Sequence, residues 1–178
     1  RRSAAACGMS TRDGGMRAAR RRGCPYRWGM TQHTAADRVA HFSARLAFET
    51  DPSDVRADQL AGADAVLVDV RSRESWNQGR ARGATHIPRQ EIATRALTEI
   101  PITTPVVVYC WGPGCNGAHK GALEFALLGY EVREMIGGFE CGAREGLPVD
   151  GEHGDATRAA DPLTSPVGAG DHGVHCDC

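Results

Sequence analysis

The sequence lacks a run of about 18 consecutive apolar residues, which is the length that identifies a membrane-spanning helix. No apolar stretch of signal-peptide type follows the basic N-terminal residues, which argues against a secretory signal. The seven cysteines are an odd number at irregular spacing, so they do not indicate a disulfide framework. These absences exclude a helical membrane span and favour a protein of the reducing cytoplasm. A length of 178 residues predicts one domain, with room for tails.

Acidic residues are scarce at the N-terminus, where residues 1–32 hold eight arginines and one acid, Asp13. This segment therefore carries +7, and because the whole chain carries -1, the remaining residues carry -8. An acidic body offers no obvious face for nucleic acid. The basic segment itself is open to three interpretations: an arm for nucleic acid or acidic lipid, an organelle transit peptide, or a disordered or artefactual extension. We expect the last, because helical periodicity begins only after Met30.

Two short apolar runs rich in β-branched residues, Ala65–Val70 and Pro105–Tyr109, predict strands buried on both faces. A third strand is expected over Glu131–Ile136, and a short extended stretch over Gly83–Pro88. Helices are expected at Thr34–Glu49, from a cap at Ser53 or Asp54 to about Leu60, and at Glu74–Gln78, Glu91–Glu99, Ala118–Leu128 and Phe139–Glu145. Apolar strands that alternate with helices predict an α/β fold with an open, mostly parallel sheet.

Residues 150–178 change to Gly, Asp, Pro, His and Thr without periodicity, which predicts a flexible tail. The tail ends in Cys176-Asp177-Cys178, with His172 and His175 nearby, a candidate for soft-metal binding or a redox relay. Its spacing is not a standard zinc pattern, so we expect no metal site.

Cys110 is the candidate nucleophile. It is the first residue after a predicted buried strand, and ligands of open α/β sheets bind at the carboxyl ends of the strands. The following loop is rich in glycine and leads into a helix, so backbone N–H groups and the helix N-terminus are expected to stabilise a thiolate and lower the Cys110 pKa. The alternative is a small buried hydrophobic residue at a strand end. We favour the role of Cys110 as a nucleophile, because a buried cysteine that only fills space does not need the glycine-rich loop.

Four segments in this order resemble the rhodanese-like family. They are Val68-Asp69-Val70-Arg71, Gly83-Ala84-Thr85-His86-Ile87-Pro88, Val107-Val108-Tyr109-Cys110, and Gly137-Gly138-Phe139 with Gly146-Leu147-Pro148-Val149. The resemblance spans about Asp51 to Val149 and places a rhodanese-like domain with an N-terminal helix at residues 33–149. It implies a doubly wound, five-stranded parallel sheet with helices on both faces, and neither a metal nor an organic cofactor.

The same resemblance implies a sulfurtransferase that moves sulfane sulfur from a donor, such as thiosulfate or a persulfide, to a thiol or a cyanide-like acceptor. Cys110 becomes the persulfide carrier, and Asp69 and Arg71 become a structural ion pair or loop tether. The amides that hold the anion come from the loop residues Trp111, Gly112, Pro113, Gly114, Cys115, Asn116 and Gly117.

The loop departs from the family in two ways. It has no arginine, and Trp111 stands where arginine is common, which weakens the binding of a dianionic donor; His119 and Lys120 are alternative sources of charge. Cys115 lies five residues after Cys110. If both thiols face one pocket, Cys115 is a possible resolving thiol that attacks a Cys110 persulfide, releases sulfide and leaves a disulfide. Otherwise it is a small residue that fills the loop. Beyond the loop, Gly142 stands at a position where the family often has tryptophan.

Three other functions compete with sulfur transfer. A phosphatase of related architecture needs arginine six residues after the cysteine, but that residue is Asn116, so this class is excluded. A non-catalytic rhodanese-like binding or regulatory module fits the arginine-free loop, although such modules usually lack the cysteine. A redox switch of Cys110 and Cys115 would form a disulfide without carrying sulfane sulfur.

Overall fold

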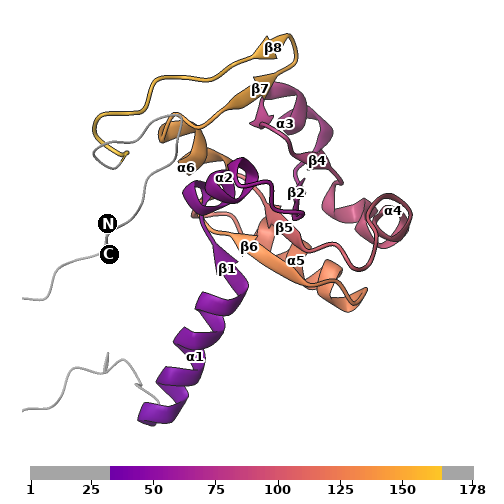
Figure 1. Cartoon of the computed structure of the whole chain (residues 1–178), viewed down its shortest axis with the longest axis vertical. Coiled ribbons are helices and arrows are strands. Elements are labelled where there is room, and N and C mark those ends of the chain that lie inside the picture. The colour runs from indigo at the N-terminus through magenta and orange to yellow at the C-terminus, as the bar shows by residue number, and fades with distance from the viewer. Residues whose placement is uncertain (1–32, 166–178) are drawn as a thin grey trace, which may run out of the picture. The chain divides into compact units, whose positions relative to one another are not determined.

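The computed structural model describes residues 33–165, and all of these except His33 and Thr34 belong to one compact unit that begins at Ala35. Five strands form its central sheet: β1 (Glu49–Thr50), β2 (Val66–Asp69), β4 (Thr85–His86), β5 (Val106–Tyr109) and β6 (Val132–Met135). Their order is β1-β6-β5-β2-β4, and every neighbouring pair is parallel (Figure 1). The predicted five-stranded parallel sheet is confirmed.

Helices cover both faces of this sheet. Successive side chains of a strand point to opposite faces, so a single strand packs against helices on both sides. Val106 and Val108 of β5 pack with residues of α4 (Ile92–Glu99) and α5 (Gly117–Leu127). Val107 and Tyr109 of β5 pack on the other face with residues of α2 (Pro52–Leu60) and α6 (Gly138–Arg144). In Figure 1, α2 and α6 accordingly lie together on one side of the sheet and α4 and α5 on the other. A short helix, α3 (Arg73–Gln78), and a 3-10 turn, η1 (Arg89–Glu91), complete the connections.

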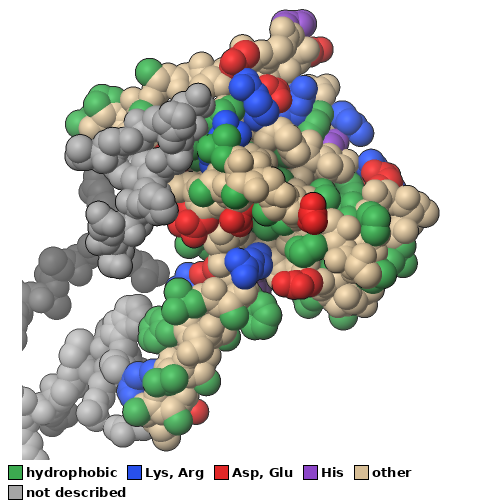
Figure 2. Space-filling model, viewed as in Figure 1, with side chains coloured by type: hydrophobic (Ala, Val, Ile, Leu, Met, Phe, Trp, Pro, Cys, Tyr) green, Lys and Arg blue, Asp and Glu red, His purple; other side chains and the backbone are tan. Residues whose placement is uncertain are grey.

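The predicted first helix is present as α1 (Ala35–Phe48), but its apolar face is not buried. Val39, Phe42 and Leu46 are exposed, and Figure 2 shows hydrophobic side chains along this helix. The edge strand β1 comes next. Its first residue, Glu49, was expected to be the last residue of the helix, and Thr50 to follow the helix. The next helix, α2, is capped by Asp51, whose side chain accepts a hydrogen bond from the Asp54 N–H. The prediction of Ser53 or Asp54 as the cap is therefore wrong, because Pro52 occupies the first helical turn and moves the start of the helix earlier.

A second, antiparallel sheet was not anticipated. It consists of β3 (Arg80–Ala81), β7 (Val149–Gly151) and β8 (Gly154–Asp155). Residues 150–155 therefore do not belong to the flexible tail predicted for 150–178. The hairpin escaped prediction because its strands are two or three residues long and polar, so they carry no hydrophobic alternation. The basic segment 1–32 and the terminal Cys176-Asp177-Cys178 lie outside the described residues.

Candidate functional site

Cys110 follows β5 at the carboxyl edge of the central sheet, where the sequence predicted it. Its side chain is 8% exposed and packs in the core with Val108 and Ala118. The loop after it makes a turn in which the Cys115 N–H donates to the Gly112 carbonyl at 3.0 Å, and α5 begins at Gly117. The loop therefore returns Cys115 toward Cys110 before the helix starts.

The start of α6 holds the cysteine loop from the other side. The Phe139 N–H donates to the Cys110 carbonyl at 3.0 Å, and the Glu140 N–H donates to the Trp111 carbonyl at 2.8 Å. Gly138 allows this approach, because its φ is 58° and a Cβ at this position would lie 2.7 Å from the Cys110 carbonyl oxygen. The Gly137-Gly138 pair thus allows the start of α6 to pack closely against the cysteine loop.

The two thiols are in contact: Cys110 Sγ lies 3.1 Å from Cys115 Sγ. The Gly117 N–H donates to Cys115 Sγ at 3.4 Å. Burial, together with the hydrogen bond to Cys115, raises the pKa of Cys110 to about 12. Burial also acts to raise the pKa of Cys115, but the Cys110 hydrogen bond and the N–H groups of Gly117 and Trp111 outweigh it, so the Cys115 pKa is lowered.

The lowered pKa is therefore that of Cys115 and not that of Cys110, and the expected lowering of the Cys110 pKa is wrong. The reason is physical. Two neighbouring thiols share one negative charge, and the charge resides on the sulfur that accepts more hydrogen bonds and is less buried. A sequence motif identifies the pair of cysteines but not which of them carries the charge.

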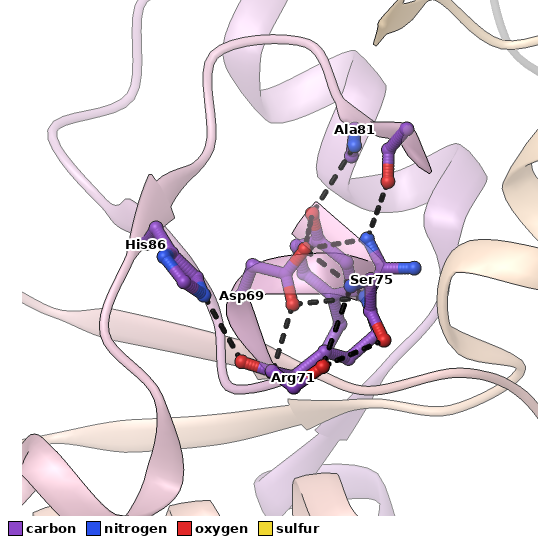
Figure 3. A network of polar contacts seen from close by, with 8 residues as sticks. Asp69, Arg71, Ser75, Ala81 and His86 are labelled. Carbon is purple, nitrogen blue, oxygen red and sulfur yellow. Dashed lines mark hydrogen bonds and ion pairs between the residues drawn. The ribbon is translucent and has the colours of Figure 1, made fainter. Parts of the chain in front are cut away.

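Asp69 and Arg71 form the predicted ion pair beside this loop, with Nη2 2.6 Å from Oδ2 and both side chains buried. Figure 3 shows the surrounding network. Arg71 Nη2 also donates to the Gly79 carbonyl, and Tyr109 Oη donates to Asp69 Oδ2 at 2.7 Å. The Ala81 N–H donates in turn to Tyr109 Oη at 3.1 Å. The network therefore ties the ends of β2 and β5 to the chain segment around β3.

Aromatic rings enclose the Arg71 guanidinium. Its central carbon lies 4.5 Å from the ring centroid of Trp111 and 4.3 Å from that of Phe139. The Trp111 side chain thus turns to the ion pair rather than to the thiols. Burial and the neighbouring Asp69 raise the pKa of Tyr109 well above its ordinary value, so Tyr109 stays a neutral donor. The sequence singled out Asp69, Arg71 and Trp111 but missed the aromatic contact of Phe139, for which no local signal exists.

A hollow of about 290 Å³ opens over the two cysteines. Gly112, Pro113 and Cys115 of the loop line it, whereas Gly114 and Asn116 are exposed. Two charged residues that sequence analysis did not identify also line it: Arg45 of α1 and Glu134 of β6. Arg45 is paired with Glu49 at 2.8 Å, so its charge is already matched. Neither residue lies near the cysteine in sequence, which is why the motif could not reveal them.

The two cations proposed at the start of α5 differ in position. His119 Nδ1 lies 3.1 Å from Glu134 Oε2, and neither His119 nor Lys120 lines the hollow. Lys120 contributes to the low pKa of Cys115 through its charge. Among residues 33–165, no cluster of three metal-ligating side chains occurs and no helix is long and apolar enough to cross a membrane.

The fold and the site define a doubly wound α/β domain with a strand-end cysteine in a glycine-rich loop. The family model for the rhodanese-like domain matches residues 52–143, about half of the chain, and the chain belongs to this family. A thiosulfate sulfurtransferase GlpE of Actinobacillus succinogenes is 36% identical over 98 residues, which cover 54% of this chain and 86% of that protein. The family thus includes sulfur-transferring relatives.

Two further likenesses concern a regulator and a solved structure. The HTH-type transcriptional regulator Rv0324 of Mycobacterium tuberculosis is 33% identical over 115 residues, which are 63% of this chain but only half of that protein. The structure of the BH2092 protein from Bacillus halodurans has a TM-score of 0.63 and 34% identity, over 68% of this chain and 89% of that one. The chain and this solved structure therefore share one fold over most of the solved chain.

Proposed function

We propose that this chain is a sulfurtransferase that carries sulfane sulfur as a persulfide on Cys110. The observation that carries the proposal is the contact of Cys110 Sγ with Cys115 Sγ at the floor of an open hollow, at the carboxyl edge of the sheet. The proposal is also supported by the similarity of this chain to GlpE, which is a thiosulfate sulfurtransferase. We also propose the reducing cytoplasm as its compartment, because seven cysteines at irregular spacing do not indicate a disulfide framework.

Each residue of the pair has a role in the loading step. Cys110 attacks the outer sulfur of the donor while its proton passes to Cys115, the sulfur that it already contacts. The sulfur–sulfur bond of the donor breaks, and the remainder of the donor, sulfite in the case of thiosulfate, leaves with the electron pair. An acceptor thiol then attacks the outer sulfur of the persulfide and restores Cys110.

The charges around the hollow favour a persulfide donor over thiosulfate. Glu134 lines the hollow, the charge of Arg45 is matched by Glu49, and the loop contributes no arginine. Among the described residues that line the hollow, a dianion meets the Glu134 carboxylate, and the one guanidinium, that of Arg45, is already paired with Glu49. We therefore propose a low-molecular-weight persulfide as donor and a thiol as acceptor.

The experiment is intact mass spectrometry of the reduced chain after incubation with thiosulfate or glutathione persulfide, beside the variant Cys110→Ser. If Cys110 accepts sulfur, we expect either an added mass of about 32 Da that a reductant removes or, where Cys115 resolves the persulfide, one released sulfide and a mass about 2 Da lower; Cys110→Ser should show neither. If the folded protein gains neither an adduct nor a new disulfide with any donor, the proposal fails. A non-catalytic binding module would then be the better description.

A further inference from the structure

The Cys110–Cys115 contact is closer than sulfur carriage on Cys110 alone requires. The two Sγ atoms are 3.1 Å apart, whereas a disulfide bond measures about 2.05 Å, so an approach of about 1 Å joins them. Both thiols line the same hollow, and neither is in a disulfide. The condition that makes Cys115 a resolving thiol, a shared pocket, is met.

The backbone is adapted to this contact at Gly117. A Cβ at this position would lie 2.4 Å from Cys110 Sγ and 3.3 Å from Cys115 Sγ. Any side chain here would therefore displace at least one of the sulfurs. The Gly112–Cys115 turn brings Cys115 back over Cys110, and Gly117 leaves the space that both sulfurs occupy. A residue that merely filled the loop would not need this space.

The polar groups near Cys115 favour its anionic form. The Gly117 N–H points at its sulfur, α5 begins two residues later with its partial positive charge, and Lys120 lies in the first turn. In agreement, the pKa of Cys115 is lowered although burial opposes this. A thiolate, rather than a thiol, attacks sulfur–sulfur bonds. The second cysteine is therefore poised as a nucleophile beside the first.

We propose that Cys115 resolves the Cys110 persulfide, so that the domain reduces sulfane sulfur to sulfide and then requires an external thiol reductant. This inference rests on the proposed function, because it needs a persulfide on Cys110. It names the final acceptor as a thiol or dithiol reductant rather than a cyanide-like nucleophile. The intramolecular attack has the advantage of proximity over any acceptor from solution.

The step balances. The Cys115 thiolate attacks Cys110 Sγ, a bond forms between the two Sγ atoms, and the bond from Cys110 Sγ to the outer sulfur breaks. The proton that Cys115 gained during loading passes to the outer sulfur, which leaves as hydrosulfide with the electron pair. The sulfane sulfur gains two electrons, which the two cysteines lose on forming their disulfide. Two thiol groups of the reductant then regenerate the dithiol and are themselves oxidised to a disulfide.

The test uses the full chain, reduced and desalted without oxygen, with one equivalent of glutathione persulfide and no added thiol. Trypsin releases residues 96–120 as one peptide, which contains Cys110 and Cys115 and no other cysteine. We expect about one sulfide per chain and a mass about 2 Da lower for this peptide, as an internal disulfide requires. A sample without donor must keep the reduced mass.

Variants separate the two cysteines. Cys115→Ser and, as a second substitution, Cys115→Ala are expected to load more slowly, to retain about 32 Da on the peptide and to release far less sulfide than the unmodified chain until thiol is added beyond the glutathione that loading sets free. Cys110→Ser is expected to release only the background sulfide of the donor. Cys141→Ser is the matched control: it removes a described thiol that does not line the hollow and should behave like the unmodified chain.

Two outcomes overturn the inference, and they differ from each other. If the unmodified chain keeps the added sulfur on peptide 96–120 and releases no sulfide without thiol, resolution by Cys115 is wrong while the proposed function stands. If neither an adduct nor a disulfide forms, the proposed function fails and the inference fails with it.

Discussion

The indole ring of Trp111 covers the guanidinium of Arg71 at 4.5 Å, so the residue that begins the cysteine loop is packed on the buried ion pair of β2. The scaffold and the reactive loop therefore share one cluster. Asp69 accepts from both Arg71 and Tyr109, and Tyr109 directly precedes Cys110. We therefore expect a change in the ion pair to alter the position of the loop, because Tyr109 and Trp111 contact the pair and flank Cys110.

Arg71→Ala is expected to lower the free energy of unfolding by about 3–5 kcal/mol, because it leaves the Asp69 carboxylate buried without its partner. Denaturant unfolding measures the effect. Arg82→Ala is the matched control: Arg82 pairs with Asp150 at 2.9 Å but is 41% exposed, so its loss should cost much less than the loss of Arg71. Equal losses in the two variants would contradict the structural role of Asp69 and Arg71.

Gly142→Ala is expected to stabilise the protein by about 1 kcal/mol, because alanine is the better helix former inside α6. The new methyl group has room: its Cβ would lie 3.4 Å from Pro52 Cβ and 3.7 Å from Leu147 Cδ1. Gly138→Ala in the same helix should destabilise instead, since its φ is 58° and its Cβ would meet the Cys110 carbonyl oxygen. Thermal unfolding compares the two, and a lower melting temperature for Gly142→Ala would refute the packing argument.

The sequence allowed the sheet and the position of Cys110 to be predicted, because both depend on local patterns. The strands Val66–Asp69 and Val106–Tyr109 are rich in β-branched valine, and Cys110 follows the second of them directly. The site's charge distribution was not predictable in this way. Arg45 and Glu134 reach the hollow from separate elements, and the pKa order of the two cysteines depends on which amides face which sulfur. Contacts of that kind arise from tertiary packing and leave no periodic signal.

Gly117→Ala is expected to abolish disulfide formation between Cys110 and Cys115 and to slow persulfide loading about tenfold or more, because its Cβ would overlap Cys110 Sγ. Peptide mass spectrometry of residues 96–120 and the rate of sulfide release measure both effects. Gly114→Ala, in the same loop, is the control, since a Cβ there meets nothing within 4 Å. If Gly117→Ala still forms the disulfide at the original rate, the space at Gly117 is not what permits the contact.

Alkylation by iodoacetamide near neutral pH is expected to modify Cys115 faster than Cys141. The pKa of Cys115 is lowered, whereas burial and the neighbouring Glu145 and Glu140 carboxylates raise that of Cys141. The Cys115 rate should rise as pH increases through its lowered pKa and reach its plateau at a lower pH than the Cys141 rate. Cys110→Ala should shift the Cys115 profile to higher pH, since the hydrogen bond between the two thiols is lost. Fragmentation of the modified peptides assigns each site, and identical profiles for the two cysteines would contradict the assignment of the thiolate.

Glu134→Gln is expected to raise kcat/KM for thiosulfate about threefold while leaving a less charged persulfide donor nearly unaffected. The Glu134 carboxylate lines the hollow that the dianion must enter, and the amide removes its charge but still accepts from His119. Salt screens the same repulsion, so the thiosulfate rate of the unmodified chain should increase with ionic strength, and that of Glu134→Gln should increase less. Glu131→Gln, an exposed carboxylate that does not line the hollow, is the control. A thiosulfate rate that Glu134→Gln leaves unchanged at low salt would show that the carboxylate does not select the donor, and the arginine-free loop alone would then have to explain any preference for persulfides.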